Sequence, residues 1–245
     1  MGKYNTIMIL GANSDISKEL VIILNQEKKI CKTILISRDV LKLQNTLKKK
    51  INLDNSYEFK SLNLENDDEI KNYLSDLKNF PDLIISFIGE LDKEKDAIKN
   101  IKRTININYL LPSKFIELIG QQLVLRKMKN SKIVGISSIA GQKGRKINYH
   151  YGASKSALST FLSGFRQKLT KENINVLTIE LGFVKTKMTK DIPFPSFLSD
   201  NAHQTAKKIL GAIYSSKEIY VPIKWRIIMF LIKLIPEKIF KKLNF

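Results

Sequence analysis

The chain contains Gly11-Ala12-Asn13-Ser14-Asp15-Ile16 between an apolar, β-rich run at residues 4–10 and the helical spacing of Leu20, Ile23 and Leu24. A strand, a tight glycine turn and a helix N-terminus form an anion site, because free backbone N–H groups and the helix dipole face a bound phosphate. We expect Ser14 to cap this helix. The turn has Gly11 as its only glycine, so its assignment to a nucleotide depends on the rest of the chain.

Short apolar runs alternate with helical patterns along the whole chain. The patterns predict strands at residues 4–10, 33–37, 57–62, 83–86, 133–137, 174–180 and 218–221. They predict helices after the glycine turn and at residues 40–50, from 65 onward, 98–127, 151–170 and 202–214. Continuous apolar strands between helices indicate a parallel sheet that is covered on both faces. We therefore expect an α/β fold: one Rossmann-type doubly wound domain of about seven strands at residues 1–222, followed by an extension at residues 223–245.

Chemically distinctive residues follow several of these strands directly, namely Gly11, Arg38, Gly89, Ser138 and Gly182. The carboxyl ends of parallel strands meet at one edge of a sheet, and ligands bind there near the topological switch point. These residues should therefore converge on one crevice.

Tyr151 and Lys155 lie four residues apart in a predicted helix, so they share one helical face. A phenol normally titrates near ~10 and needs stabilisation of its phenolate to act as an acid or base at neutral pH. We expect the Lys155 ammonium to lower the pKa of Tyr151, because an opposite charge favours the ionised form. Ser138, thirteen residues before Tyr151, could hold a substrate carbonyl.

Composition excludes several classes of protein. The 245 residues are 43% hydrophobic, which suits one globular domain with a large core. The single cysteine, Cys31, excludes a disulfide framework and suits a reducing compartment, so a cytoplasmic location is expected. Two histidines and one cysteine leave little for a transition-metal site, and none is predicted. The N-terminal apolar stretch is too short for a signal peptide and enters the glycine turn directly.

The formal net charge of +19 has three interpretations. Lysine-rich usage can reflect compositional drift, with the lysines on solvated faces. Alternatively, the charge attracts the protein to an anionic membrane or to a phosphate-bearing substrate. Nucleic-acid binding is not predicted, because the basic residues are dispersed and form no basic arm or aromatic-interleaved motif.

Taken together, these motifs resemble the classical short-chain dehydrogenase/reductase family over about residues 4–222. That family uses an Asn-Ser-Tyr-Lys tetrad, and the resemblance places it on Asn108, Ser138, Tyr151 and Lys155, with Asn106 as the alternative asparagine. It implies reduction of a ketone by hydride transfer from a nicotinamide, with Tyr151 as general acid. Lys155 would also hold the nicotinamide ribose, and Asn108 would hold a water that links Lys155 to solvent.

The resemblance also implies a set of cofactor-binding residues: Gly11, Asn13, Ser14, Asp15, Ile16, Ser37, Arg38, Asn63, Leu64, Gly89, Tyr151, Lys155, Gly182, Val184 and Thr186. Ser37-Arg38 stands where members that prefer NAD carry an acidic residue. A guanidinium suits a 2′-phosphate, so NADP(H) is predicted over NAD(H).

Several positions depart from the family pattern. Asp15 and Ser17 replace two glycines of the phosphate turn, and we expect the Asp15 carboxylate to turn outward toward helix N–H groups. Asn63 replaces the usual adenine-contacting aspartate. Leu181 stands where the family has a proline before Gly182. The family's Asn-Asn-Ala-Gly motif after the fourth strand keeps only its glycine here, Gly89.

The last segment, residues 225–245, is apolar and basic but too short and too interrupted to span a bilayer. It could lie in a membrane interface with Trp225 and the lysines at headgroup depth, on the inner face of the membrane, or pack against a partner subunit or the sheet edge. Residues 188–201 suggest an apolar substrate lid through Pro193, Phe194, Pro195 and Phe197.

The turn Ser14-Asp15-Ile16, the loop at residues 88–92 and this tail are similar to a subgroup that reduces lipid-linked keto-sugars, the decaprenylphosphoryl-2-keto-ribose reductase-like proteins. That resemblance implies a polyprenyl-phosphate substrate and a flavin-dependent oxidase partner. Two other functions remain open: a soluble reductase of a 3-oxoacyl thioester or small ketone, and a non-catalytic nucleotide-binding membrane or scaffold protein. Helices at residues 98–127 and 151–170 suggest a homodimer or homotetramer, because they commonly form subunit interfaces in this family.

Overall fold

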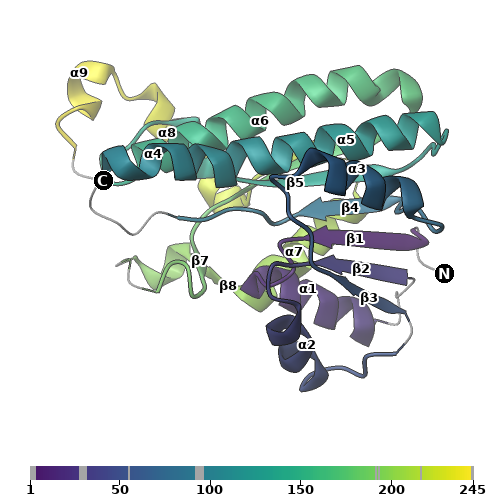
Figure 1. Ribbon diagram of the computed structural model, residues 1–245. Coiled ribbons are helices and arrows are strands. Elements are labelled where there is room, and N and C mark those ends of the chain that lie inside the picture. The colour runs from purple at the N-terminus through teal and green to yellow at the C-terminus, as the bar shows by residue number, and fades with distance from the viewer. Residues whose placement is uncertain are drawn as a thin grey trace.

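The computed structural model describes residues 4–27, 32–54, 56–91, 97–190, 192, 194–215 and 217–243. Its centre is a seven-stranded sheet in which every described strand pair is parallel (Figure 1). In spatial order the strands are β3 (Tyr57–Lys60), β2 (Lys32–Ile36), β1 (Thr6–Leu10), β4 (Leu83–Ser86), β5 (Lys132–Ser138), β6 (Asn175–Leu181) and β9 (Ile219–Tyr220). The predicted doubly wound parallel sheet is confirmed.

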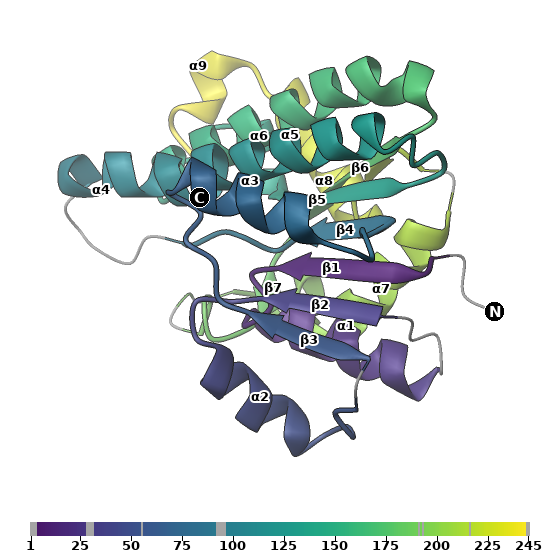
Figure 2. The same cartoon turned by 45° about the vertical axis from the view of Figure 1, so that its right-hand side comes forward.

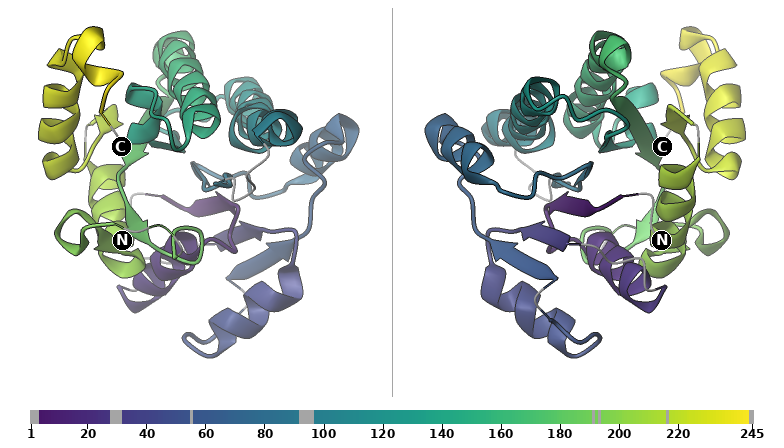
Figure 3. Two further views of the ribbon diagram at one scale, coloured as in Figure 1. Left: turned by 90° about the vertical axis from the view of Figure 1, so that its left-hand side faces the viewer. Right: turned by 90° about the vertical axis from the view of Figure 1, so that its right-hand side faces the viewer.

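Helices cover both faces of the sheet (Figure 3). One face carries α3 (Asp67–Asp76), α5 (Leu111–Leu125) and α6 (Tyr149–Leu169), and the other carries α1 (Asp15–Gln26), α2 (Val40–Lys48) and α7 (Ala202–Tyr214). Successive residues of a strand point to opposite faces. In β1, Ile7 and Ile9 therefore join the core under α1 and α7, whereas Met8 and Leu10 join the core under α5.

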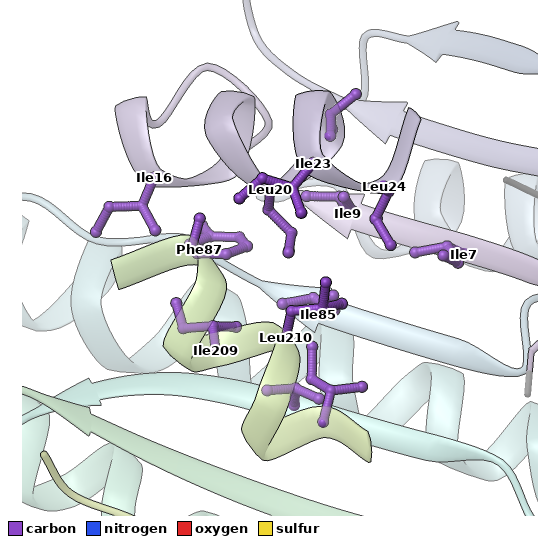
Figure 4. Packing of buried hydrophobic residues seen from close by; sticks show 14 of the residues in the cluster. Ile7, Ile9, Ile16, Leu20, Ile23, Leu24, Ile85, Phe87, Ile209 and Leu210 are labelled. Carbon is purple, nitrogen blue, oxygen red and sulfur yellow. The ribbon is translucent and has the colours of Figure 1, made fainter. Parts of the chain in front are cut away.

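The packing of α1 and α7 on the sheet explains the apolar spacing after the glycine turn. Leu20, Ile23 and Leu24 lie on one side of α1 and meet Ile209 and Leu210 of α7 beside the strand residues (Figure 4). All five side chains are almost completely buried. This contact fixes the start of α1 over the end of β1.

The chain reverses direction across the sheet at β1. β1 pairs with β2 on one side and with β4 on the other, so the carboxyl ends of β1 and β4 flank the topological switch point. Connections from β1, β2 and β4 leave this same edge. The strand order therefore puts the switch point where the sequence predicts a ligand site.

Two local features differ from the expectations. The predicted helix at residues 98–127 is divided into α4 (Ala97–Ile105), a π-helical turn η1 (Asn106–Leu110) and α5. α4 extends past the carboxyl-terminal edge of the sheet (Figure 2). A separate two-stranded sheet, β7 (Val184–Lys185) with β8 (Asp200–Asn201), was not predicted, because strands of two residues carry no periodic signal. The described residues also form 3₁₀ turns at η2 (Ile139–Gln142), η3 (Thr170–Glu172) and η4 (Ser196–Leu198).

The C-terminal residues form α8 (Ile223–Leu234) and α9 (Glu237–Phe240). Trp225 and Met229 of α8 are buried against Ile139 of η2, and the Trp225 indole donates a hydrogen bond of 3.1 Å to the Leu198 carbonyl. Of the two alternatives for this segment, headgroup depth for Trp225 is wrong, because its ring is buried against the protein itself. None of the helices among the described residues combines the length and apolarity needed to span a bilayer.

Backbone-to-backbone contact positions α6 beside η2. A Cβ on Gly141 of η2 would lie 2.7 Å from the Ser156 backbone nitrogen and 2.9 Å from the Lys155 carbonyl carbon. Such distances are shorter than any van der Waals contact, so only glycine permits this approach. Gly141 thus sets the distance between η2 and the turn of α6 that carries Lys155.

We predict opposite effects for the same substitution at two glycines. Gly141→Ala should destabilise the protein by about 1–3 kcal/mol, because the backbone of α6 must move. Gly164→Ala, in the exposed part of α6 with nothing within 4 Å, should stabilise it by about 0.5–1 kcal/mol through helix propensity. Urea unfolding of both variants measures the difference, and equal effects would contradict this packing.

Candidate active site

The glycine turn lies directly against the loop after β4. Gly11 has a φ of +71°, and a Cβ there would lie 3.0–3.1 Å from the backbone of Phe87 and Ile88. Ser14 takes the N-cap position of α1, but its side chain makes no capping hydrogen bond, so the predicted cap is wrong in this respect. The first turn of α1 therefore keeps backbone N–H groups that no capping side chain occupies, which is the arrangement that binds phosphate.

Asp15 turns away from this turn, although not toward helix N–H groups as expected. One carboxylate oxygen accepts the Lys187 backbone N–H at 3.0 Å, and the other pairs with Lys18 at 3.0 Å. Burial alone would raise the pKa of Asp15, but these bonds outweigh it and the pKa is lowered. The negative charge is thus neutralised locally, and it ties α1 to the segment after β7.

Asn13 connects the glycine turn to the end of β2. Its amide donates to the Ser37 hydroxyl at 2.6 Å and to the Asp39 carbonyl at 2.8 Å. Two of the predicted cofactor residues therefore lie together. Arg38 follows Ser37 at the strand end, and its side chain is exposed. Within the described chain, no residue accepts a hydrogen bond from its guanidinium.

The remaining predicted cofactor residues occupy the same edge of the sheet. Ile16 is buried in α1, and Asn63 closes its own turn by accepting the Glu65 backbone N–H at 3.0 Å, with Leu64 packed on the core beside it. Val184 is buried, and the Thr186 backbone donates to the Thr189 hydroxyl at 3.2 Å.

Gly182 follows β6 and lies under the Trp225 indole, which a side chain at this position would overlap. Phe183 stacks on Phe194 at 3.4 Å between ring centroids, and both rings contact Trp225. Of the predicted lid, Phe194 is packed inside, Phe197 is 71% exposed, and Pro193 lies outside the described residues. The C-terminal helix α8 therefore supports this aromatic cluster.

Lys155 is buried where three segments meet. Its ammonium donates to the Ile136 carbonyl of β5 at 3.2 Å. A Cβ on Gly89 would lie 2.9 Å from this nitrogen and 3.1 Å from Asn108 Oδ1, so the three residues are neighbours. Burial lowers the pKa of Lys155 to about 8. An amine with this pKa can exchange a proton near neutral pH.

Asn108 is completely buried in the π-helical turn η1. Its amide donates to the carbonyls of Glu90 at 2.9 Å and Thr104 at 3.0 Å, and its oxygen accepts the Glu90 N–H at 3.0 Å. Isolated π turns occur frequently at functional sites. Asn106 instead points to Glu65, at 2.9 Å, so Asn108 is the asparagine beside Lys155.

Tyr151 lies near the start of α6, beside Lys155, and is only partly exposed. Its ring centroid lies 5.9 Å from the Lys155 ammonium. The Ser138 hydroxyl lies near the phenol, accepts the Ala140 N–H at 3.1 Å and donates to the Leu181 carbonyl at 3.4 Å. Burial raises the pKa of Tyr151 to about 12, while Ser138 and the Arg145 guanidinium pull it down. The prediction that Lys155 lowers this pKa is wrong for this structure, because burial dominates and the counteracting charge comes from Arg145.

Arg145 was missed by the sequence analysis. It lies in the segment between η2 and α6, and its side chain is partly buried. Burial lowers its pKa, and the Tyr151 phenol opposes that shift. The sequence does not indicate that Arg145 lies near Tyr151, because it is one of 42 lysine and arginine residues in the chain.

The site fits a dinucleotide by three observations. The glycine turn and the open start of α1 form a phosphate cradle, Gly89 leaves space beside Lys155, and the strand ends converge there. Among the described residues, no three histidine, cysteine, aspartate or glutamate side chains lie together as a metal site would require.

Comparison with known proteins agrees with this geometry. The family model described as short chain dehydrogenase matches residues 5–194. An uncharacterized oxidoreductase of Myxococcus xanthus is 27% identical over 153 residues, which cover 62% of this chain and 60% of that protein. The 3-oxoacyl-(acyl-carrier-protein) reductase FabG of Thermotoga maritima is 24% identical over 194 residues, 76% of each chain.

A solved structure shares the fold at much lower sequence identity. The short chain dehydrogenase from Burkholderia cenocepacia, in complex with NADP, has a TM-score of 0.81 and 14% identity, and the match covers 99% of this chain and 98% of that one. The family match spans most of the described sheet, including β1 to β6 and the segment that contains Ser138, Tyr151 and Lys155. The chain therefore belongs to the short chain dehydrogenase family.

Proposed function

We propose that this protein is an NADPH-dependent oxidoreductase that reduces a ketone to an alcohol. The observation that carries the proposal is that Ser138, Tyr151, Lys155 and Asn108 gather at the carboxyl edge of the sheet. Groups gathered in this way can bind a carbonyl and deliver a proton to it. The four residues come from β5, α6 and η1, so the fold itself assembles them.

When bound, NADPH supplies the hydride. Tyr151 keeps its proton at neutral pH, because its pKa is raised to about 12. It can nevertheless donate that proton as the carbonyl oxygen becomes an alkoxide, which is more basic than a phenolate. Ser138 holds the same oxygen through its hydroxyl, and the buried donors stabilise the developing charge more strongly than water would.

In this proposal, Lys155 and Asn108 help to return a proton to Tyr151. Lys155 has a pKa of about 8 and lies near Asn108, whose amide is held by the Thr104 carbonyl of α4 and by the Glu90 backbone in the loop after β4. A lysine with this pKa can return a proton toward Tyr151 after each turnover.

The proposed preference for NADP(H) rests on Arg38. Its exposed guanidinium, which has no partner among the described residues, follows the end of β2 next to the Ser37 hydroxyl that Asn13 fixes. A guanidinium recognises a phosphate through paired charge-assisted hydrogen bonds. The structural relative from Burkholderia cenocepacia contains NADP, which supports the same choice.

The proposed substrate is a keto-sugar linked to a polyprenyl phosphate. The net charge of +19 and the apolar, basic C-terminal segment support a lipid phosphate as the substrate's carrier. In such a reaction sequence a flavin-dependent oxidase would produce the ketone. The second candidate is a soluble reductase of a 3-oxoacyl thioester, which the similarity to FabG favours.

The proposed site of membrane contact is the outer side of α8. Ile227, Phe230 and Leu234 are 56–63% exposed there, whereas Trp225 and Met229 face the protein. This side would let a cytoplasmic protein bind reversibly to the inner face of the membrane. Assembly into a dimer or tetramer through α4, α5 and α6 is part of the same proposal.

We predict that Tyr151→Phe lowers the rate of ketone-dependent NADPH oxidation by about 10²–10⁴-fold, because the proton donor is lost while the ring remains. Purified protein assayed against lipid-linked keto-sugars, 3-oxoacyl thioesters and small ketones measures this and ranks the substrates. Retained activity in Tyr151→Phe would exclude Tyr151 as the acid.

The same assay tests the cofactor. The unmodified protein should oxidise NADPH faster than NADH, and Arg38→Ala should remove that preference without changing the rate with NADH. Tyr149→Phe is the matched control for Tyr151→Phe, because Tyr149 is an exposed tyrosine in the same helix. Loss of activity in the control would assign the effect to the helix rather than to the acid.

We predict that Ile227→Ser/Phe230→Ser/Leu234→Ser reduces flotation with phosphatidylglycerol vesicles at least several-fold, because the exposed apolar side of α8 is lost. The triple variant retains Trp225 and should keep its melting temperature. Leu125→Ser, which changes a 72% exposed leucine at the end of α5, should float normally. Equal flotation of the unmodified protein, the triple variant and Leu125→Ser would contradict membrane contact through α8.

A further inference from the structure

The Glu180 side chain of β6 joins the two segments that flank the site. Its Oε2 accepts a hydrogen bond from the Gln142 amide of η2, and its Oε1 lies 3.2 Å from the Ser159 hydroxyl of α6. The side chain is partly buried, and among the described residues no basic group forms an ion pair with it. A carboxylate in this place is therefore bound through neutral donors of η2 and α6 alone.

The contact continues from Ser159 to the backbone of Lys155. The Ser159 hydroxyl also lies 2.8 Å from the Ser137 hydroxyl of β5, and it can donate its one proton to Ser137 or to Glu180. Ser137, the partner of Glu180 in the register of β5 and β6, donates to the Lys155 carbonyl at 3.0 Å. Residues 155 and 159 are one helical turn apart, so both ends of this turn are held from the sheet.

A second polar contact joins α6 to β6 further from the site. Arg166 of α6 donates to the Thr178 hydroxyl of β6 at 2.8 Å. Thr178 and Glu180 are two residues apart in the strand, so both side chains point to the same face of the sheet. Ser159 and Arg166 are seven residues apart, which is two helical turns, so they share one face of α6. Of these two contacts, the one made by Glu180 adjoins the turn that carries the catalytic lysine.

The position of the Lys155 ammonium depends on where this turn is held. The ammonium donates to the Ile136 carbonyl at 3.2 Å, at the end of a flexible four-carbon side chain. The close contact of Gly141 with the backbone at residues 155–156 prevents α6 from moving toward η2. Glu180 acts in the opposite sense, because its bonds to η2 and α6 resist their separation.

We propose that Glu180 is a positioning residue, which holds the turn of α6 at residues 155–159 against β5 and η2 and thereby fixes the Lys155 ammonium at the site. Hydrogen bonds to a charged acceptor are stronger than those between neutral groups, which suits this role. The effect on turnover rests on the proposed ketone reduction, whereas the effect on the place of the ammonium does not.

Positioning and charge have opposite effects on the pKa of Lys155, so they can be separated. Removal of a neighbouring carboxylate charge would lower this pKa, because the ammonium loses a favourable interaction. Release of the turn would raise it from about 8 toward the ordinary value of ~10.4, because water would reach the ammonium. The charged groups on the segment facing this lysine from the loop after β4 are already paired, since Glu90 binds Arg103 at 2.7 Å.

The test compares three single variants by NMR of ¹³Cε-labelled lysine, with the Lys155 signal identified by its absence in Lys155→Arg. Glu180→Leu, which removes both acceptor oxygens, should raise the pKa of Lys155 to above about 9. Glu180→Gln, which loses the charge but keeps an acceptor oxygen, should leave it within about 0.5 of the unmodified value. Thr178→Val, which removes the second contact between α6 and β6, should also leave it there. A fall in Glu180→Leu, or an equal rise in Thr178→Val, would overturn the inference.

Ser159→Ala breaks the same contact from the helix and supplies the test if Glu180→Leu does not fold. It should raise the pKa of Lys155, and the double variant Ser159→Ala/Glu180→Leu should show no further rise, because both changes remove one connection. An unchanged pKa in Ser159→Ala, or additive effects in the double variant, would contradict a connection through Ser159.

Steady-state kinetics with NADPH and a ketone separate this inference from the reductase proposal. Glu180→Leu should lower kcat by about 10-fold or more and change KM for the ketone by less than about 3-fold, because a displaced ammonium impairs proton return rather than binding. Thr178→Val should keep kcat even where its melting temperature falls. The predicted NMR result without turnover in the unmodified protein would contradict the reduction and support the role of Glu180. Normal kcat and an unchanged Lys155 pKa in Glu180→Leu would overturn that role and leave the reduction intact.

Discussion

A buried lysine at the carboxyl edge of the sheet is the constraint around which the site is organised. Within the described part of the chain, the Lys155 ammonium donates to the Ile136 carbonyl, and it lies beside Gly89 and near Asn108. Burial without a carboxylate partner is costly for an ammonium and moves its pKa to about 8. The cost is tolerated because α6, η1 and the loop after β4 are held together by core packing on both sides of the sheet. The polar cluster in turn needs those segments at fixed distances.

Close packing around two glycines positions the other residues of the site. Gly141 allows η2 to touch the backbone of α6, which brings Ser138, just before η2, close to Tyr151 at the start of α6. Trp225 covers Gly182 and supports Phe183 and Phe194 from the C-terminal helix. The C-terminal segment is therefore part of the site's framework as well as the proposed membrane contact. Its two sides have different roles because one side of α8 is buried and the other is exposed.

Much of the fold could be predicted because its signals are local and repeated. Continuous apolar runs such as residues 83–86 identified strands, and the glycine turn identified the start of α1. The pairing of Tyr151 with Lys155 followed from helical spacing. Features that depend on contacts across the chain could not be predicted: the bond from Asp15 to the Lys187 backbone, the π turn that carries Asn108 and the burial of Trp225. The pKa of Tyr151 was mispredicted for the same reason, since helical spacing indicates a neighbouring charge but not the depth of burial.

In the proposed reaction, burial keeps the Tyr151 phenol protonated until a stronger base forms beside it. Ultraviolet titration of the tyrosinate band in the unmodified protein, minus that of Tyr151→Phe, isolates this one group. The account predicts that the difference signal appears with a pKa near 12, well above the ordinary value of a phenol. A phenolate that forms below pH ~9 in the free protein would contradict it, because Tyr151 would then be an acidified group and not a buried proton donor.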